Sequence, residues 1–357
     1  MLPVRRTFNL IMNLKRYQRQ MIFYGLGEAG QRKLLDSTVV IIGCGATGSV
    51  LANHLARAGV GRLRLVDRDF VELNNLHRQM LYDEEDMVSG LPKAVAAERR
   101  LRAINSDIEI EGIVADFNPG NALDLLKDAD LALDGTDNFE TRYLLNDACL
   151  KLGVPWVYTG VVASYGMTAT LVPDGAVDKV GREATGCLQC LLGTKPTTGG
   201  PTCDTAGVLG PIVGVLGSIS AGEAIKLLTG GGEINRGLLN VDLWDNTFET
   251  FMLAGRDANC PACAHSDYRF LDAEMGSRSA ALCGRNAVQV NNPAAHIDLP
   301  VIAKRLEALG KVTQNAYLVR AWIDDYEISL FPDGRAIIKG TEDPELARSV
   351  YARYVGV

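Results

Sequence analysis

The 357-residue sequence predicts an α/β protein whose first half forms a largely parallel sheet. One observation is the alternation, from residue 38 to residue 159, of short apolar or β-branched runs with stretches of helical periodicity. The other is the glycine-rich turn of residues 43–48, which directly follows the first apolar run and opens a helical stretch. A strand that returns through a helix is parallel to its predecessor, and the repeated pattern therefore predicts a parallel sheet.

The first part of the chain has the expected elements in regular order. The predicted strands are residues 38–42, 62–66, 108–114, 129–133 and 154–159, and the predicted helices between them are residues 49–57, 93–103, 121–127 and 140–151. The pattern then changes: residues 164–172 alternate, and residues 178–207 form a long segment rich in Gly, Thr, Pro and Cys. A long helix at 210–228 and strands at 237–243 and 247–253 complete this part.

The last part of the chain predicts a small, separate α+β unit. A polar stretch at 265–280 is typical of a linker. Beyond it we expect strands at 287–290 and 316–322, a helix at 298–309, a hairpin around Phe331-Pro332-Asp333-Gly334 and a terminal helix from about Pro344. The predicted domains are residues 1–270 and 271–357.

Composition excludes several classes of protein. A net charge of −7 and a pI near 5.3 argue against a nucleic-acid partner. No apolar run is expected to reach the roughly 20 residues that span a bilayer. The basic N-terminal arm lacks a long apolar core and a small-residue cleavage site, so it is not typical of a targeting peptide. We therefore expect a cytoplasmic protein without a membrane partner.

The glycine turn has the sequence context of a phosphate-binding site. Gly43, Gly45 and Gly48 lie between a strand and a helix, where glycines let a phosphate approach the backbone and the helix N-terminus favours negative charge. Asp67 ends the next strand and is placed to accept hydrogen bonds from ribose hydroxyls. Alone, these features fit NAD or FAD as well as ATP.

Residues beyond the second predicted strand favour a triphosphate. The run from Asp67 to Gln79 contains acids, amides and Arg78, and Lys93 opens the next helix. Cations at the carboxyl ends of the strands suit phosphates and a leaving pyrophosphate, whereas a nicotinamide needs no such cluster. Asp137-Asn138 adds a carboxylate suited to Mg²⁺.

Eight cysteines are too few for a disulfide scaffold in a chain of this length, but four of them are paired. Cys187 with Cys190 and Cys260 with Cys263 form two C-x-x-C pairs. Four thiolates can hold a structural zinc ion, but the wide separation of the pairs leaves a redox dithiol open on spacing alone.

Taken in order, these motifs resemble the ThiF/MoeB/HesA family, the bacterial relatives of ubiquitin-activating enzymes. The matching motifs are Arg16-Tyr17-x-Arg19-Gln20, the glycine turn, D-x-D-x-V-E-x-x-N-L-x-R-Q at 67–79, Lys93, D-x-T-D-N at 134–138 and the two cysteine pairs. The resemblance covers roughly residues 14–264. It implies a Rossmann-like ubiquitin-activating-enzyme fold with a mixed sheet, parallel in its first half and antiparallel in its second, plus the small C-terminal α+β domain.

The resemblance also implies an activity. An enzyme of this family adenylates the C-terminal glycine carboxylate of a ubiquitin-like sulfur-carrier protein, using ATP and Mg²⁺, and the four paired cysteines hold structural zinc. The implied nucleotide-site residues are Gly43, Gly45, Gly48, Asp67, Asp69, Asn74, Asn75, Leu76, His77, Arg78, Lys93, Asp137 and Asn138. Gln79 would assist at the reacting carboxylate. Arg19 would serve the partner subunit's site in a homodimer.

Several features of the sequence fit more than one interpretation. Cys203 would accept the activated carrier in ThiF-like members, but MoeB-like members dispense with it, and an unreactive loop cysteine is the alternative. Thiamine and molybdopterin biosynthesis are both possible destinations for the sulfur, and a sulfur-donor protein is a possible further partner. Carrier docking, dimer support and sulfur delivery are alternative roles for the C-terminal unit, and its Cys283 has no assigned role. A non-catalytic or NAD-binding protein of the same fold is the rival hypothesis.

Overall fold

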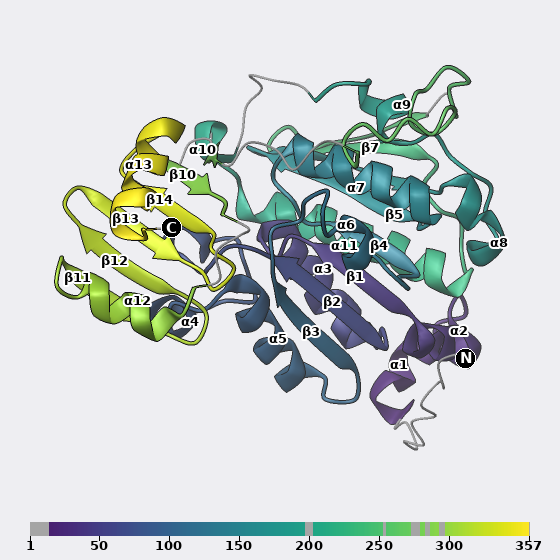
Figure 1. Cartoon of the computed structure of the whole chain (residues 1–357). Coiled ribbons are helices and arrows are strands. Elements are labelled where there is room, and N and C mark those ends of the chain that lie inside the picture. Colours follow the sequence, from purple (N-terminus) through teal and green to yellow (C-terminus); the bar gives the residue numbers. More distant parts are fainter. Residues whose placement is uncertain are drawn as a thin grey trace, which may run out of the picture.

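The computed structural model describes residues 14–196, 203–252, 255–272, 279–282, 286–292 and 297–356, and it contains two separate sheets (Figure 1). The first sheet has eight strands in the order β3-β2-β1-β4-β5-β6-β7-β8. Their bounds are β1 Thr38–Ile42, β2 Arg62–Asp67, β3 Glu109–Val114, β4 Leu131–Asp134, β5 Trp156–Val162, β6 Tyr165–Leu171, β7 Gly237–Asp242 and β8 Thr247–Met252.

Helices cover both faces of this sheet. Those in the first part of the chain are α1 Gln18–Ile22, α2 Gly27–Asp36, α3 Ala46–Ala58, α4 Glu84–Val88, α5 Lys93–Ile104, α6 Ala122–Leu125, α7 Phe139–Leu152, α8 Val177–Val180, α9 Leu188–Leu192, α10 Cys203–Ala206 and α11 Gly210–Thr229. Strand β1 shows why there are two layers: Val39 and Ile41 pack into one core with α3, α5 and α11, while Val40 and Ile42 pack into another with α7. Successive residues of a strand point to opposite faces, so an all-apolar strand is buried on both.

The sheet changes direction halfway across, as the resemblance implied. Strands β3, β2, β1, β4 and β5 are parallel. Strands β6, β7 and β8 are each antiparallel to their neighbour, starting with the β5–β6 pair. The mixed α/β fold class is therefore confirmed.

The second sheet has six antiparallel strands in the order β11-β12-β13-β14-β10-β9. Its elements are β9 Ser279–Leu282, β10 Ala287–Val290, α12 Leu299–Leu306, β11 Lys311–Gln314, β12 Val319–Ile323, β13 Tyr326–Leu330, β14 Ala336–Lys339 and α13 Pro344–Tyr354. Helices α12 and α13 pack on it to form a core of its own. The predicted hairpin joins β13 to β14, and Gly334 adopts a positive φ of 82° in its turn.

Two expectations need correction. Helix α11 has 20 residues, a mean hydropathy of 1.4 and 56% burial, and among the described residues it is the one helix long and apolar enough to span a membrane. It nevertheless lies in the core against α3 and β5, and its buried Glu223 accepts hydrogen bonds from Thr170 and the amide of Asn235. The predicted linker at 265–280 is also partly wrong, because Leu271 is 7% exposed and the Phe270 ring lies 4.9 Å from that of Tyr143.

Candidate functional site

The glycine turn lies at the carboxyl end of β1 and packs tightly against the turn that follows β4. Gly43 has a φ of 89°, which favours glycine, and a Cβ on Gly48 would lie 1.9 Å from the Gly43 carbonyl oxygen. A Cβ on Gly135 would meet the same oxygen at 2.2 Å. These glycines are thus needed for the turn itself, which places the start of α3 at this edge of the sheet.

Asp67 fixes the end of β2 to this turn. Its carboxylate accepts the Cys44 amide at 2.6 Å and the Asp69 amide at 2.7 Å. Burial raises the pKa of Asp67, and the charge of Lys93 opposes that shift. Tyr82 donates its hydroxyl to the Cys44 carbonyl at 2.6 Å, so both ends of the Cys44 peptide are held.

The buried Lys93 pairs with the half-buried Asp69 beside the turn. The Lys93 side chain is 5% exposed, and its Nζ lies 3.5 Å from Asp69 Oδ2. The Lys93 amide also donates to the Asp69 carbonyl at 2.8 Å. A lysine is rarely buried unless it is paired, so this ammonium is held in place at the strand edge.

The segment from Asn74 to Gln79 presents buried amides to the same edge. Gln79 is 3% exposed, and its Nε2 lies 3.9 Å from the position of a Cβ on Gly45. Within the described parts of the chain, Gln79 Oε1 and Asn75 Oδ1 are buried without a hydrogen-bond partner. Buried polar atoms are normally bonded, so these two oxygens point to a ligand or water at this place.

The other residues of this segment lie around those amides. Arg78 is half-buried and donates to the Asn74 carbonyl at 2.7 Å. Asn74 and His77 are exposed, and Leu76 packs against the core. The His77 carbonyl lies 3.1 Å from the position of a Cβ on Gly210, so the start of α11 is adjacent.

The turn after β4 combines a buried ion pair with an exposed acid. Asp134 is fully buried, and its Oδ2 accepts from Arg142 Nε at 2.9 Å. Burial lowers the pKa of Arg142, but the carboxylate of Asp134 outweighs this, and the net shift is upward. Asp137 is exposed, and Asn138 caps α7 by accepting the Thr141 amide at 2.9 Å.

Sequence reasoning missed the Asp134–Arg142 pair. Its signal was present: an acid ends a buried strand, and an arginine follows eight residues later on a helix that is buried on that side. Arg142 also donates to the carbonyls of Thr136 and Thr159. It thereby holds the loop that carries Asp137.

Arg19, predicted for the nucleotide site, is placed far from this edge. It is exposed on α1, next to Tyr17, which packs against Gly59 at the end of α3. Helix α3 begins at the glycine turn and has 13 residues, so it separates the two ends by about 20 Å. Arg19 therefore does not reach the nucleotide site of its own chain.

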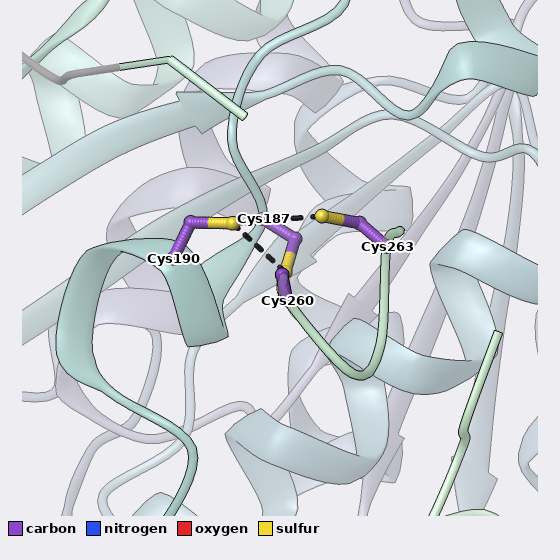
Figure 2. Close-up of side chains that lie close together, drawn as sticks. All are labelled: Cys187, Cys190, Cys260 and Cys263. Carbon is purple, nitrogen blue, oxygen red and sulfur yellow. Dashed lines mark hydrogen bonds between the residues drawn. The ribbon is translucent and has the colours of Figure 1, made fainter. Parts of the chain in front are cut away.

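The four paired cysteines come together in space (Figure 2). Their Sγ atoms all lie within 4.8 Å of one another, with Cys187–Cys260 at 3.6 Å and Cys190–Cys263 at 3.5 Å. Four thiolates about 2.3 Å from one tetrahedral zinc ion would be about 3.8 Å apart, so this set fits zinc. Hydrogen bonds from the Cys187 and Cys263 thiols hold the pKa of Cys190 well below its usual range.

The remaining cysteines divide into packing residues and one at a helix start. Cys44 and Cys149 are buried, and burial raises the pKa of both thiols, as expected for packing residues. Cys203 is the first residue of the short helix α10, a few residues before α11. Cys283 lies outside the described residues.

The fold and this edge define a nucleotide-binding α/β protein with a four-thiolate metal-site candidate. The chain belongs to the ThiF family, whose model matches residues 17–262. It is 44% identical over 345 residues to the sulfur carrier protein ThiS adenylyltransferase of Bacillus subtilis (strain 168), covering 96% of this chain and 99% of that relative. It is 40% identical to the SAMP-activating enzyme E1 of Haloferax volcanii, covering 70% of this chain and 88% of that one.

Solved structures agree with this assignment. The crystal structure of E. coli MccB with ATP matches with a TM-score of 0.58 and 25% identity, covering 71% of this chain and 75% of that one. Microcin C7 biosynthetic enzyme MccB in complex with N-formylated MccA matches with a TM-score of 0.60 and 25% identity, over 70% and 75% of the two chains.

Proposed function

We propose that this protein is an ATP-dependent adenylyltransferase that activates the C-terminal glycine carboxylate of a ubiquitin-like sulfur-carrier protein. The observation that carries the proposal is the buried Lys93, paired with Asp69 beside the glycine turn and the two unpartnered amide oxygens. A fixed ammonium at this edge suits a triphosphate. The 44% identity to a ThiS adenylyltransferase along nearly the whole chain supports a carrier of the ThiS type.

The reaction forms one bond and breaks one. A carboxylate oxygen of the carrier attacks the α-phosphorus of ATP, the bond to the bridging oxygen breaks, and pyrophosphate leaves with the electron pair. Lys93 and Arg78 neutralise the phosphate charge, and Gln79 orients the reacting carboxylate. Asp137, the exposed acid of the loop that Arg142 holds, would bind Mg²⁺, which supplies further charge neutralisation at the phosphates.

Three further parts of the proposal concern Arg19, the four-cysteine cluster and Cys203. Because Arg19 is about one length of α3 from its own site, it contributes only across a homodimer, to the site of a second subunit. The four-cysteine cluster holds structural zinc, since four protein ligands leave no open coordination position. After adenylation, Cys203 Sγ attacks the acyl carbon of the carrier, the bond to AMP breaks and AMP leaves. Sulfide supplied by a sulfur-donor protein then displaces the Cys203 thiol and leaves the carrier as its thiocarboxylate.

The test is ATP–pyrophosphate exchange with a purified carrier that ends in Gly-Gly. Exchange should require the carrier and should stop when its terminal glycine is removed. Asp137→Ala should lower the exchange rate about 100-fold or more, as expected for loss of one electrostatic contact to the transition state. Asp178→Ala, which removes an equally exposed acid on α8, is the matched control and should leave exchange unchanged.

Cys203→Ala separates adenylation from sulfur transfer. This variant should keep normal exchange and lose formation of the carrier thiocarboxylate, measured by mass spectrometry. Absence of exchange with any Gly-Gly carrier, together with binding of NADH and no binding of ATP, would establish the rival NAD-binding protein instead.

A further inference from the structure

The second sheet contacts both chain segments that supply the Asp69–Lys93 pair. Figure 1 shows it, in green to yellow, beside α4. One contacted segment is 68–72, which includes Asp69, and the other is the 89–92 turn that leads into Lys93. The two segments also pair with each other: Phe70 forms a bridge with Pro92, and the Val71 amide donates to the Leu91 carbonyl at 3.1 Å.

Phe70 inserts its side chain into the second sheet. It is 5% exposed and packs in a cluster with Ala287, Leu318, Phe331 and Ile337, all of which belong to the C-terminal unit. The Arg320 guanidinium lies over the Phe70 ring, 4.2 Å from its centroid. The residue directly after Asp69 is thus anchored by side chains that are more than 200 residues away in sequence.

Polar contacts between the second sheet and the two segments lie around the Phe70 side chain. Arg335 Nη1 donates to the Arg68 carbonyl at 3.1 Å, and Lys339 Nζ lies 2.6 Å from Glu72 Oε1. Asn315 Nδ2 donates to the carbonyls of Ser89 at 3.2 Å and Gly90 at 2.9 Å. Each contact fixes a backbone or side-chain group next to the nucleotide site, and a buried, packed residue has little rotamer freedom.

Asp116, just after strand β3, links Arg68 to strand β10 of the second sheet. Its carboxylate accepts from Arg68 Nη1 at 2.9 Å and from Gln289 Nε2, on β10, at 3.1 Å. Burial lowers the pKa of Arg68, but the carboxylates of Asp116, Asp69 and Asp137 outweigh it, and the net shift is upward. Arg68 therefore stays charged between the second sheet and the predicted magnesium ligand.

We propose that the second sheet is a positioning element of the nucleotide site, and that Phe70 and Asn315 are the positioning residues through which it sets the Asp69–Lys93 geometry. The inference rests on the proposed function, since ATP is the ligand whose phosphates Lys93 holds. The second sheet touches the backbone of both segments, so loss of these particular contacts lets Asp69 and Lys93 move apart without removing either. Affinity for ATP should fall, whereas affinity for the carrier should not.

The experiment compares Phe70→Ala and Asn315→Asp with wild type in steady-state exchange. Phe70→Ala should raise KM for ATP about tenfold and leave KM for the carrier unchanged, and Phe70→Leu, which refills the cluster, should restore most of the loss. Asn315→Asp keeps the oxygen that accepts the amides of Tyr317 and Leu318 but replaces the donor to the 89–90 carbonyls, and should act in the same direction.

Ile302→Ala is the matched control. Ile302 lies on α12 in the core of the second sheet, so this substitution destabilises the unit without touching segments 68–72 or 89–92. Equal increases in KM for ATP in Phe70→Ala and Ile302→Ala, or no increase in Phe70→Ala, would overturn the positioning role.

A second readout needs neither carrier nor turnover. The rate at which an amine-reactive reagent modifies Lys93, measured by peptide mass spectrometry, should rise in Phe70→Ala and stay at the wild-type value in Ile302→Ala. If wild type shows no exchange but the Lys93 rates differ as stated, the proposed function fails and the positioning role holds. If exchange occurs and the Lys93 rates and ATP affinities are equal in all variants, the positioning role alone fails.

Discussion

The acids at the strand ends differ in their exposure and in their hydrogen-bond partners, and they therefore differ in role. Both carboxylate oxygens of Asp67 accept hydrogen bonds from backbone amides. The carboxylate of Asp134 accepts hydrogen bonds from Thr136, Arg142 and the Thr159 amide. Asp137 is exposed instead. The first two acids hold the shape of their loops, whereas we propose Asp137, at the exposed position, as the magnesium ligand. The sequence places each acid at the correct edge but cannot separate the two roles, because the roles depend on neighbours from other strands.

Asp147, on α7, gives a pH-dependent prediction. Burial raises the pKa of this carboxyl to about 6, although it accepts the Phe270 amide at 2.9 Å. The unfolded value is about 3.9, so the folded state binds the proton more tightly. The contribution of Asp147 to stability is therefore least favourable above about pH 6 and improves as pH falls towards 4.

The measurement is urea unfolding of wild type and Asp147→Asn at pH 7.5 and pH 5. Relative to the variant, wild type should gain about 1 kcal/mol of stability on going to pH 5. Asp178→Asn, at an exposed position, should show no such relative change. A stability difference between wild type and Asp147→Asn that is the same at both pH values would contradict the assignment.

At the level of elements, burial accounts for most of what could be predicted, although helix α2, which buries Leu34 and Leu35, was missed. The central strands and the long helices α3, α5, α7 and α11 bury apolar residues at regular intervals, and the sequence predicts all of them. Helix α4 buries no residue, and three of the four residues of β11 are exposed. Such elements carry no hydrophobic period, so they were missed. Helix α4 is held instead by a capping box between Asp83 and Asp86.

Helix α7 offers a way to separate capping from catalysis. Asn138 accepts the Thr141 amide as N-cap, and it is also a predicted nucleotide-site residue. Asn138→Ala should lower the free energy of unfolding by about 1 kcal/mol and reduce exchange. Asn138→Asp keeps a capping oxygen and should restore stability, but its added negative charge beside the phosphates should leave exchange reduced. Full recovery of exchange in Asn138→Asp would limit this residue to capping.

At the scale of the whole molecule, the parallel half of the first sheet carries the nucleotide site and the second sheet supports it from one side. The motifs predicted that their residues would meet at one edge of the sheet, because the carboxyl ends of parallel strands meet there. They could not predict that Arg335 and Lys339 would contact Arg68 and Glu72, each 267 residues away. Hydrophobic periodicity describes one element at a time and contains no information on such distant packing.

The four-cysteine cluster predicts a metal dependence of the whole fold. The purified protein should contain one zinc ion per chain, and Cys260→Ser or chelation under mildly destabilising conditions should lower the melting temperature markedly. Exchange at low temperature should survive, because the cluster is not part of the nucleotide site. Cys149→Ala, which removes a buried thiol outside the cluster, should leave the zinc content unchanged. Full thermal stability in metal-free protein would count against a structural zinc ion.

The spacing of these cysteines also bears on the unfolded chain. Cys187 and Cys260 are 73 residues apart, so an ion that joins them closes a ring containing Cys203, α11 and the outer strands β7 and β8. A permanent link across a loop of that length removes roughly 4 kcal/mol of conformational entropy from the denatured ensemble. A chain that keeps its metal while unfolding therefore refolds from a smaller set of conformations, and the ends of the segment around Cys203 never diffuse apart.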